Sequence, residues 1–122
     1  MVKKTIKYTD YNGKEREEDY YFNLSKVELL EMEMSAEGGL ENKIKKIVES
    51  DNKAEIVKYF KEIIKKSFGK KSEDGKRFIK NPKDFEEFEQ TEAYVNLFME
   101  LATNADAGAN FINGIIPQGL KA

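Results

Sequence analysis

The stretch KTIKYTDYNGKEREEDYYF, Lys4 to Phe22, predicts a β-hairpin near the start of the chain. Apolar and polar residues alternate in KTIKYT, as they do in a half-buried strand, and DYNG is a turn signal. Two loop lengths are open. A two-residue Asn12-Gly13 loop would set the apolar side chains of Ile6 and Tyr8 opposite acidic residues.

A three-residue loop, Tyr11-Asn12-Gly13, gives the better register. Gly13 then takes a left-handed bulge position, and Lys7 faces Glu17 across the hairpin. Because a slip of one residue would turn every apolar side chain to the other face, we predict this register. It pairs Tyr8 with Arg16, Ile6 with Glu18 and Lys4 with Tyr20, and puts Ile6, Tyr8, Tyr20 and Phe22 on one face.

Short amphipathic helices are expected after the hairpin. In LSKVELLEMEM, Ser25 is the expected N-cap, Glu28 completes a capping box, and Gly38-Gly39 ends the helix. A second helix is expected over residues 40–50. A third runs from an Asn52 cap to about Phe68, with its apolar face made by Ile56, Phe60, Ile63 and Ile64 and lysines opposite.

The second half of the chain carries three more helix signals. Asn81 followed by Pro82 predicts a helix start, and Thr91 predicts the next one, with Tyr94, Val95, Phe98, Leu101 and Ala102 as its apolar residues. Thr103 with Asp106 predicts the cap of the last helix, which Pro117 stops. Between residues 69 and 81, Asp74-Gly75 indicates either a small hairpin or an ordered loop.

These elements predict an α+β fold, mainly α, with an N-terminal β-hairpin followed by five or six short amphipathic helices. A chain of 122 residues is expected to form a single domain. We expect residues 1–23 to hold the hairpin, residues 24–117 a helical body, and residues 118–122 a flexible C-terminal tail.

The composition argues against enzymes. The chain has no Cys and no His, which removes thiolate nucleophiles, zinc-thiolate sites and the commonest general base. We predict a non-enzymatic protein without metal or other cofactors. No apolar run reaches the roughly 20 residues of a membrane span, and the start shows no signal peptide. We therefore expect a cytosolic protein that does not contact membranes.

Two stretches lack the spacing of a phosphate-binding loop and of a calcium-binding loop. SFGKKSEDG lacks the earlier glycine and the following Ser or Thr of a phosphate loop. The acidic run DFEEFEQTE has no calcium-loop spacing and is interpreted as a solvated helix face around Phe85 and Phe88.

Charge is unevenly distributed along the chain. Residues 58–83 hold 10 basic and 3 acidic side chains, whereas residues 84–122 hold 1 basic and 7 acidic ones. The basic part is an ordinary lysine-coated helix, a protein-binding face, or a nucleic-acid site; a pI of about 5.4 disfavours nucleic acid. The imbalance also indicates self-association as a further interaction. The candidate charged association face is Lys65, Lys66, Lys70, Lys71, Lys76 and Arg77.

The C-terminal segment has two interpretations. Its apolar residues either pack on Phe98 and Leu101 as a core helix, or they form a partner-facing surface, where the small residues around Gly108 would let another backbone approach. A helix can do both. The candidate partner-binding residues are Phe111, Ile112, Ile115, Ile116, Pro117 and Leu120, of which the last three lie past the expected helix end.

Several linked stretches resemble one family. YYFNLSKVELLEME, EGGL, FKEIIKKSFG, SEDGKRFIKN and TEAYVNLFMELATNADAGANFINGIIP occur in this order. Together they resemble the short tail assembly chaperones of long-tailed bacteriophages (siphophages) of Gram-positive hosts, over nearly the whole chain.

The resemblance implies a non-enzymatic role in tail assembly. Members bind the tape measure protein, keep its long apolar helices soluble, and help tail tube protein to polymerise around it. They are absent from the mature virion, and many also occur in a longer, frameshifted form. The alternatives are a structural tail completion or connector protein, and a small nucleic-acid-binding module that uses residues 58–83.

Overall fold

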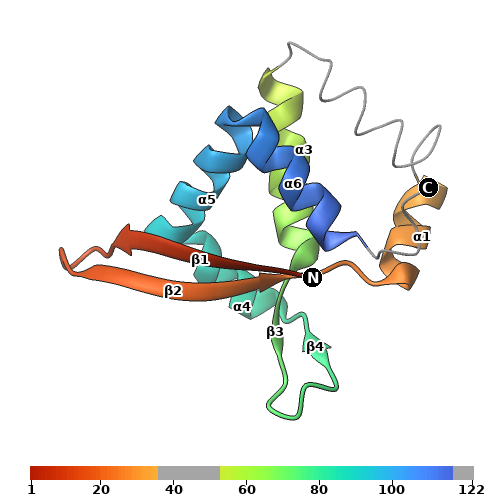
Figure 1. Cartoon of the computed structure of the whole chain (residues 1–122), viewed down its shortest axis with the longest axis horizontal. Helices are drawn as coiled ribbons and strands as arrows, with labels where there is room; N and C mark the ends of the chain where they lie inside the picture. The colour runs from red at the N-terminus through yellow and green to blue at the C-terminus, as the bar shows by residue number, and fades with distance from the viewer. Residues whose placement is uncertain (36–52, 117–122) are drawn as a thin grey trace.

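The computed structural model describes residues 1–35 and 53–116 (Figure 1). The side chains of residues 32–35 lie outside this description, as does the helix predicted over residues 40–50. The described elements are β1 (Val2–Thr9), β2 (Glu15–Phe22), α1 (Lys26–Ser35), α3 (Lys53–Ser67), β3 (Phe68–Lys71), β4 (Phe78–Ile79), α4 (Pro82–Glu89), α5 (Glu92–Thr103) and α6 (Ala105–Ile115).

The N-terminal hairpin has the predicted register. β1 and β2 pair antiparallel, with Lys7 opposite Glu17 and Ile6 opposite Glu18. Gly13 has a φ of 80°, the left-handed conformation that the three-residue loop requires. The side chain of Asp10 closes the loop by accepting hydrogen bonds from the backbone of Asn12 and Lys14. The observed pairing confirms the prediction, and it buries Ile6 and Phe22 and half-buries Tyr8 and Tyr20.

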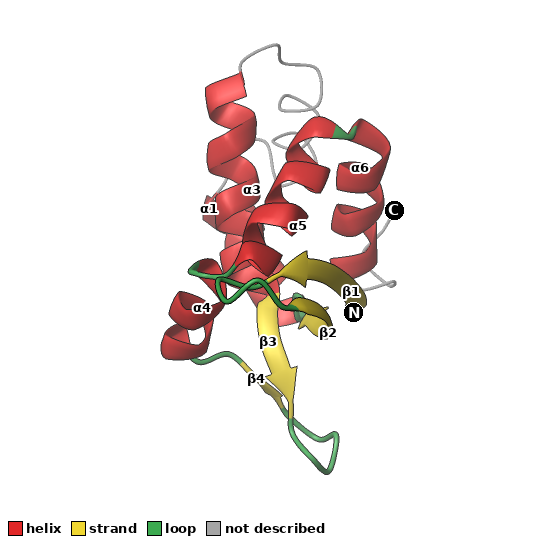
Figure 2. Cartoon of the chain, turned by 90° about the vertical axis from the view of Figure 1, so that its left-hand side faces the viewer, coloured by secondary structure: helices red, strands yellow, loops and turns green. Residues whose placement is uncertain are grey.

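The sheet is larger than the predicted hairpin. Among the described residues it has four strands, in the order β1-β2-β3-β4, so the stretch after α3 forms a hairpin rather than a loop. β3 extends β2 only at its end, where Phe22 pairs with Phe68 and Tyr21 with Gly69. The β3–β4 hairpin turns at Gly75, whose φ is 74°, and projects from the body of the molecule (Figure 2).

Most helix starts follow the predicted caps. Ser25 and Glu28 exchange the two hydrogen bonds of a capping box, Asn81 caps α4, and Thr91 caps α5. The predicted N-cap of the last helix is wrong. Its N-cap is Asn104, which accepts from the Ala107 amide, and not Thr103.

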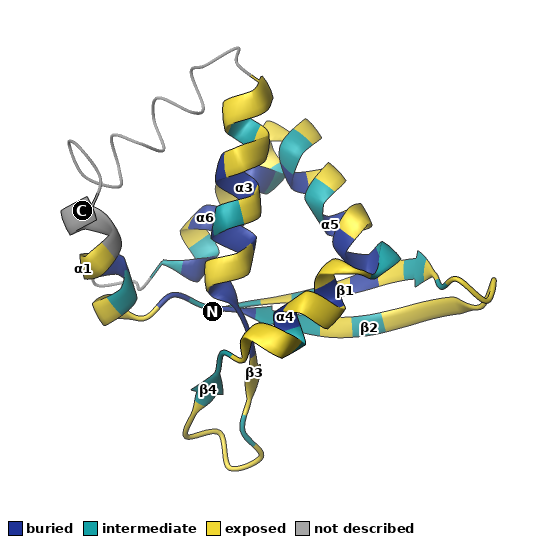
Figure 3. Cartoon of the chain, turned by 180° about the vertical axis from the view of Figure 1, so that it is seen from behind, coloured by how far each residue is buried: buried dark blue, intermediate teal, exposed yellow. Residues whose placement is uncertain are grey.

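The core lies where the helices meet the sheet. α3, α5 and α6 stand over β1 and β2 (Figure 1), and buried residues gather along this junction (Figure 3). Phe22 is fully buried and contacts the rings of Phe68, Phe88 and Phe111. The core therefore joins residues from the first hairpin, the middle and the C-terminal helix into one α+β body.

Some apolar positions differ from the predicted faces. In α5 the buried residues are Ala93, Tyr94, Leu97 and Leu101, whereas Val95 is exposed. Val95, named in the sequence among the apolar residues of this helix, therefore lies outside its buried face. The acidic helix α4 has the solvated face that the sequence predicts. Phe85 and Phe88 are buried, and the glutamates between and beyond them are exposed.

A hydrogen-bonded group stabilises the inner face of the first hairpin. The Glu18 carboxylate accepts from the hydroxyls of Tyr8 and Tyr20, the latter at 2.9 Å. These bonds, first that from Tyr8, lower the pKa of Glu18. Burial, followed by hydrogen bonding to Tyr8 and to Glu18, raises the pKa of Tyr20. The group keeps a carboxylate ionised beside the aromatic core.

Candidate functional site

An apolar cleft of about 180 Å³ opens between α3, α5 and α6. α3 supplies one wall, and the junction of α5 and α6 supplies the other. The described residues that line the cleft are Ile56, Tyr59, Phe60, Leu101, Ala102, Thr103, Ala105, Gly108, Ala109 and Ile112.

Small residues keep the cleft open. Ala102, Ala105 and Ala109 line the cleft with single methyl groups, so the side chains of the α5–α6 wall extend only a short way into it. Gly108 brings α6 against α3: a Cβ at this position would lie 2.9 Å from Cζ of Phe60. Larger side chains on this wall would fill the space that the fold leaves.

The chemistry of the cleft suits apolar side chains. None of the described residues that line it carries a charge at neutral pH, and the polar side-chain groups among them are the hydroxyls of Tyr59 and Thr103. Burial, with a smaller contribution from the charge of Glu62, raises the pKa of Tyr59, so this hydroxyl stays protonated. Within residues 1–35 and 53–116 no cluster of three or more potential metal ligands occurs. The cleft can hold hydrocarbon but offers no acid–base pair.

The C-terminal candidates divide into three groups. Phe111, Ile112 and Ile115 are buried, as the core-helix interpretation expects, and their contact with a partner stays a prediction. Of these, Ile112 also lines the cleft. Ile116 is half-buried and packs against the core. Pro117 and Leu120 lie outside the described residues.

The basic candidates come from α3 and the β3–β4 hairpin, which follow each other directly in the chain. Lys66 pairs with Glu62 at 3.0 Å and Lys70 with Asp84 at 3.7 Å, and Nζ of Lys71 lies 4.7 Å from the centre of the Tyr21 ring. These three cations thus have partners within the chain. Lys65, Lys76 and Arg77 are exposed and have no ion pair among the described residues.

The sequence indicated part of the cleft. Its small residues around Gly108 were recognised as a place where another backbone could approach. Tyr59, which lies in the basic stretch of residues 58–83, is buried in the cleft wall. Helical spacing could have predicted this position, because Tyr59 follows Ile56 by three residues and therefore lies on the same face of the helix.

Comparison with known proteins gives one family. The model of a family described as "Phage tail assembly chaperone" matches residues 1–122. Neither the curated proteins nor the solved structures include a match. None of the described helices is long and apolar enough to cross a membrane.

Proposed function

Because the chain belongs to the phage tail assembly chaperone family, we propose that it binds the tape measure protein and assists polymerisation of the tail tube protein around it. The sequence resemblance to this family is confirmed by a match over the whole chain. The tape measure protein and the tail tube protein are the proposed partners, and the phage is proposed to be a siphophage of a Gram-positive host.

The apolar cleft is the observation that carries this proposal. A protein that keeps long apolar helices soluble needs a groove for their side chains and a charged exterior around it. The cleft between α3, α5 and α6 is lined by apolar and small residues, whereas 36% of the chain is charged. Ala105 and Ala109 are exposed at this cleft and would let a client helix approach closely.

The role we propose is non-enzymatic. The cleft holds an apolar helical segment without changing it chemically, and release follows when tube subunits cover that segment. We place the protein in the host cytosol during assembly and outside the mature virion. Detection of the chain in purified virions would favour a structural tail component instead.

Co-expression with the tape measure protein tests the proposal. We expect the tape measure protein to be insoluble alone, and to become soluble and co-elute with the chaperone when both are expressed. The control is co-expression with an unrelated acidic protein of similar size. A tape measure protein that stays insoluble, or is soluble without co-elution, would contradict the proposal.

A further inference from the structure

A second surface lies on the opposite side of α3 from the cleft. Lys58, Lys61 and Lys65 are exposed, and on a helical wheel they point away from Ile56 and Phe60, which line the cleft. Lys76 and Arg77 are exposed in the turn of the β3–β4 hairpin, which begins where α3 ends. We call Lys58, Lys61, Lys65, Lys76 and Arg77 the basic face.

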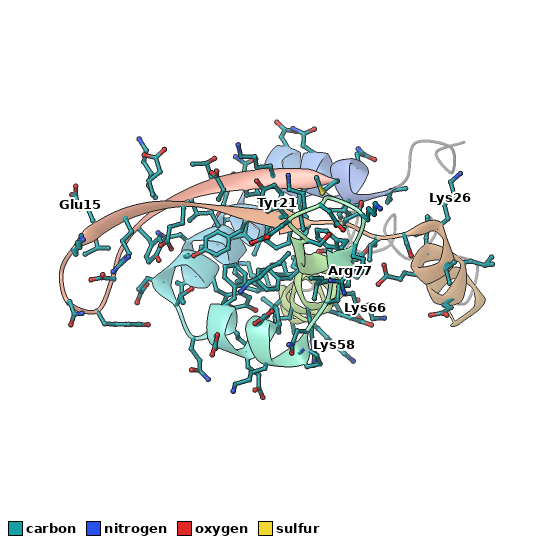
Figure 4. The ribbon with its side chains drawn as sticks, turned by 90° about the horizontal axis from the view of Figure 1, so that it is seen from below. Glu15, Tyr21, Lys26, Lys58, Lys66 and Arg77 are labelled. Carbon is teal, nitrogen blue, oxygen red and sulfur yellow. The ribbon has the colours of Figure 1, made fainter. Side chains whose placement is uncertain are left out.

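We propose that the basic face binds an acidic helical segment of another protein. This interaction goes beyond the proposed client binding, because it uses charges on a surface separate from the apolar cleft. Figure 4 labels Lys58 and Lys66 on α3 and Arg77 on the β3–β4 hairpin, away from Glu15 at the far end of the first hairpin.

The cations of the basic face are not neutralised by the part of the chain that the structure describes. The ion pairs of residues 58–83 there involve only Lys66, Lys70 and Lys80. Exposed cations without partners repel one another and attract a surface of opposite charge. Among the described residues, the acidic C-terminal part contributes one ion-paired carboxylate to this region, Asp84 on Lys70. The charge imbalance seen in the sequence therefore remains on the folded surface.

The spacing of the lysines on α3 favours a helical partner. Lys58, Lys61 and Lys65 follow the i, i+3, i+7 pattern of one helix face and span roughly 10 Å along the axis. Carboxylates with the same spacing on a partner helix would give that helix a surface of complementary charge. The hairpin extends the positive surface beyond the end of α3 with Lys76 and Arg77.

The hairpin presents its cations on an ordered turn. Oδ1 of Asp74 accepts from the Ser72 hydroxyl at 2.6 Å and from the Lys76 amide at 3.0 Å. The Ser72 hydroxyl in turn accepts from the Arg77 amide at 3.0 Å. Little loop ordering is then needed on binding, which lowers the cost of association.

The aromatic residues beside the hairpin argue against a nucleic-acid partner. Single strands bind by stacking bases on open rings. Lys71 covers the ring of Tyr21, and the ring of Phe78 lies over Gly69, where a Cβ would be 2.5 Å from it. The chain also has a net charge of −2, which repels a polyanion. Discrete carboxylates on a helix suit this surface better.

Binding of a labelled helical peptide tests the proposal. The peptide carries glutamates at i, i+3 and i+7 on an alanine- and glutamine-rich background. We expect saturable binding by fluorescence anisotropy that weakens as salt is raised from 50 to 300 mM, and a loss of at least about tenfold when Lys58, Lys61 and Lys65 are changed to Glu, since about 1.4 kcal/mol corresponds to that factor.

Matched variants make the result specific. Changing Lys7, Lys14 and Lys26 to Glu alters the net charge equally on exposed residues elsewhere, and we expect it to change binding less than threefold. Lys76→Glu with Arg77→Glu leaves α3 intact and should also weaken binding. The proposal would be overturned if both triple variants lost binding equally or if the peptide did not bind. Tighter binding of an oligothymidylate of similar length would also overturn it. None of these results bears on client binding in the cleft.

Discussion

Gly108 of α6 lies directly against the Phe60 ring of α3, so closely that a Cβ on Gly108 would be 2.9 Å from Cζ of Phe60. The same Cβ would be 3.0 Å from the Leu101 carbonyl oxygen, which belongs to the backbone and cannot easily move. This contact sets the separation of the two helices that form the cleft. It links the packing of the core to the proposed binding surface.

We predict that Gly108→Ala destabilises the protein by about 1–3 kcal/mol, the usual range for overpacking, despite the better helix propensity of alanine. Urea unfolding followed by circular dichroism measures the change. Asn110→Ala, on an exposed position of the same helix, is the control and should stay within about 0.5 kcal/mol of the parent protein. An increase in stability for Gly108→Ala would contradict the described contact.

The N-cap of α6 gives a second prediction. Asn104→Ala removes the side chain that accepts from the Ala107 amide at 3.1 Å, so it should cost about 1 kcal/mol of stability. Thr103→Ala should cost less, because the Thr103 hydroxyl only donates to the Met99 carbonyl, which already lies within a helix. Thermal unfolding of both variants decides between the two caps. A larger loss for Thr103→Ala would restore the assignment made from sequence.

The attachment of α1 gives a third prediction. Nζ of Lys80 lies 2.6 Å from a Glu28 carboxylate oxygen, and this ion pair connects α1 to the residue after β4. Lys80→Met keeps an apolar stem but removes the charge, and should cost about 0.5–1 kcal/mol. Amide hydrogen exchange should become faster in α1, whereas Lys83→Met, at an exposed lysine with no ion pair among the described residues, should leave it unchanged. Unchanged exchange in both variants would show that the ion pair does not hold α1.

The pH dependence of stability gives a fourth prediction. The pKa of Glu18 is lowered in the folded state by its bonds to Tyr8 and Tyr20. Its contribution is therefore present above the ordinary value of 4.5 and is lost as pH falls through the lowered pKa. Glu18→Gln should cost about 1 kcal/mol at pH 7, and the difference from the parent protein should shrink below about pH 4 as Glu18 becomes protonated.

Urea unfolding at pH 7, 5 and 3 measures this effect. Glu17→Gln, on the exposed face of the same strand, should show a much smaller difference at pH 7. Because the pKa of Tyr20 is raised above 10.0, stability should also fall as pH rises beyond 10. A constant difference for Glu18→Gln at all three pH values would contradict the described group.

Local signals in the sequence predicted much of the fold. The register of the first hairpin followed from Gly13 and from the alternation of Ile6 and Tyr8, because turn chemistry and a buried face act on the same few residues. The capping box of Ser25 and Glu28 is local in the same way. Such elements can be predicted because their determinants lie within a few residues of one another.

Long-range packing limited the rest of the prediction. The pairing of β3 with β2 joins Phe68 to Phe22, and nothing in either stretch alone specifies this partner. The cleft depends on Gly108 meeting Phe60, so small residues indicated a close approach without showing to what. The burial of Phe111, Ile112 and Ile115 was weighed in the sequence as a core helix, but the apolar pattern alone could not separate a core from a partner surface.

Capture of the tape measure protein by cleft variants tests the central claim most directly. Ala109→Leu adds bulk at an exposed position that lines the cleft, whereas Asn113→Leu adds a leucine at an exposed position of α6 that does not line it. The measurement is the fraction of co-expressed tape measure protein that stays soluble and co-elutes with each variant. We predict a loss of at least about fivefold for Ala109→Leu and less than twofold for Asn113→Leu, with both variants folded by circular dichroism. Full capture by Ala109→Leu, or equal losses in both variants, would contradict the assignment of client binding to the cleft.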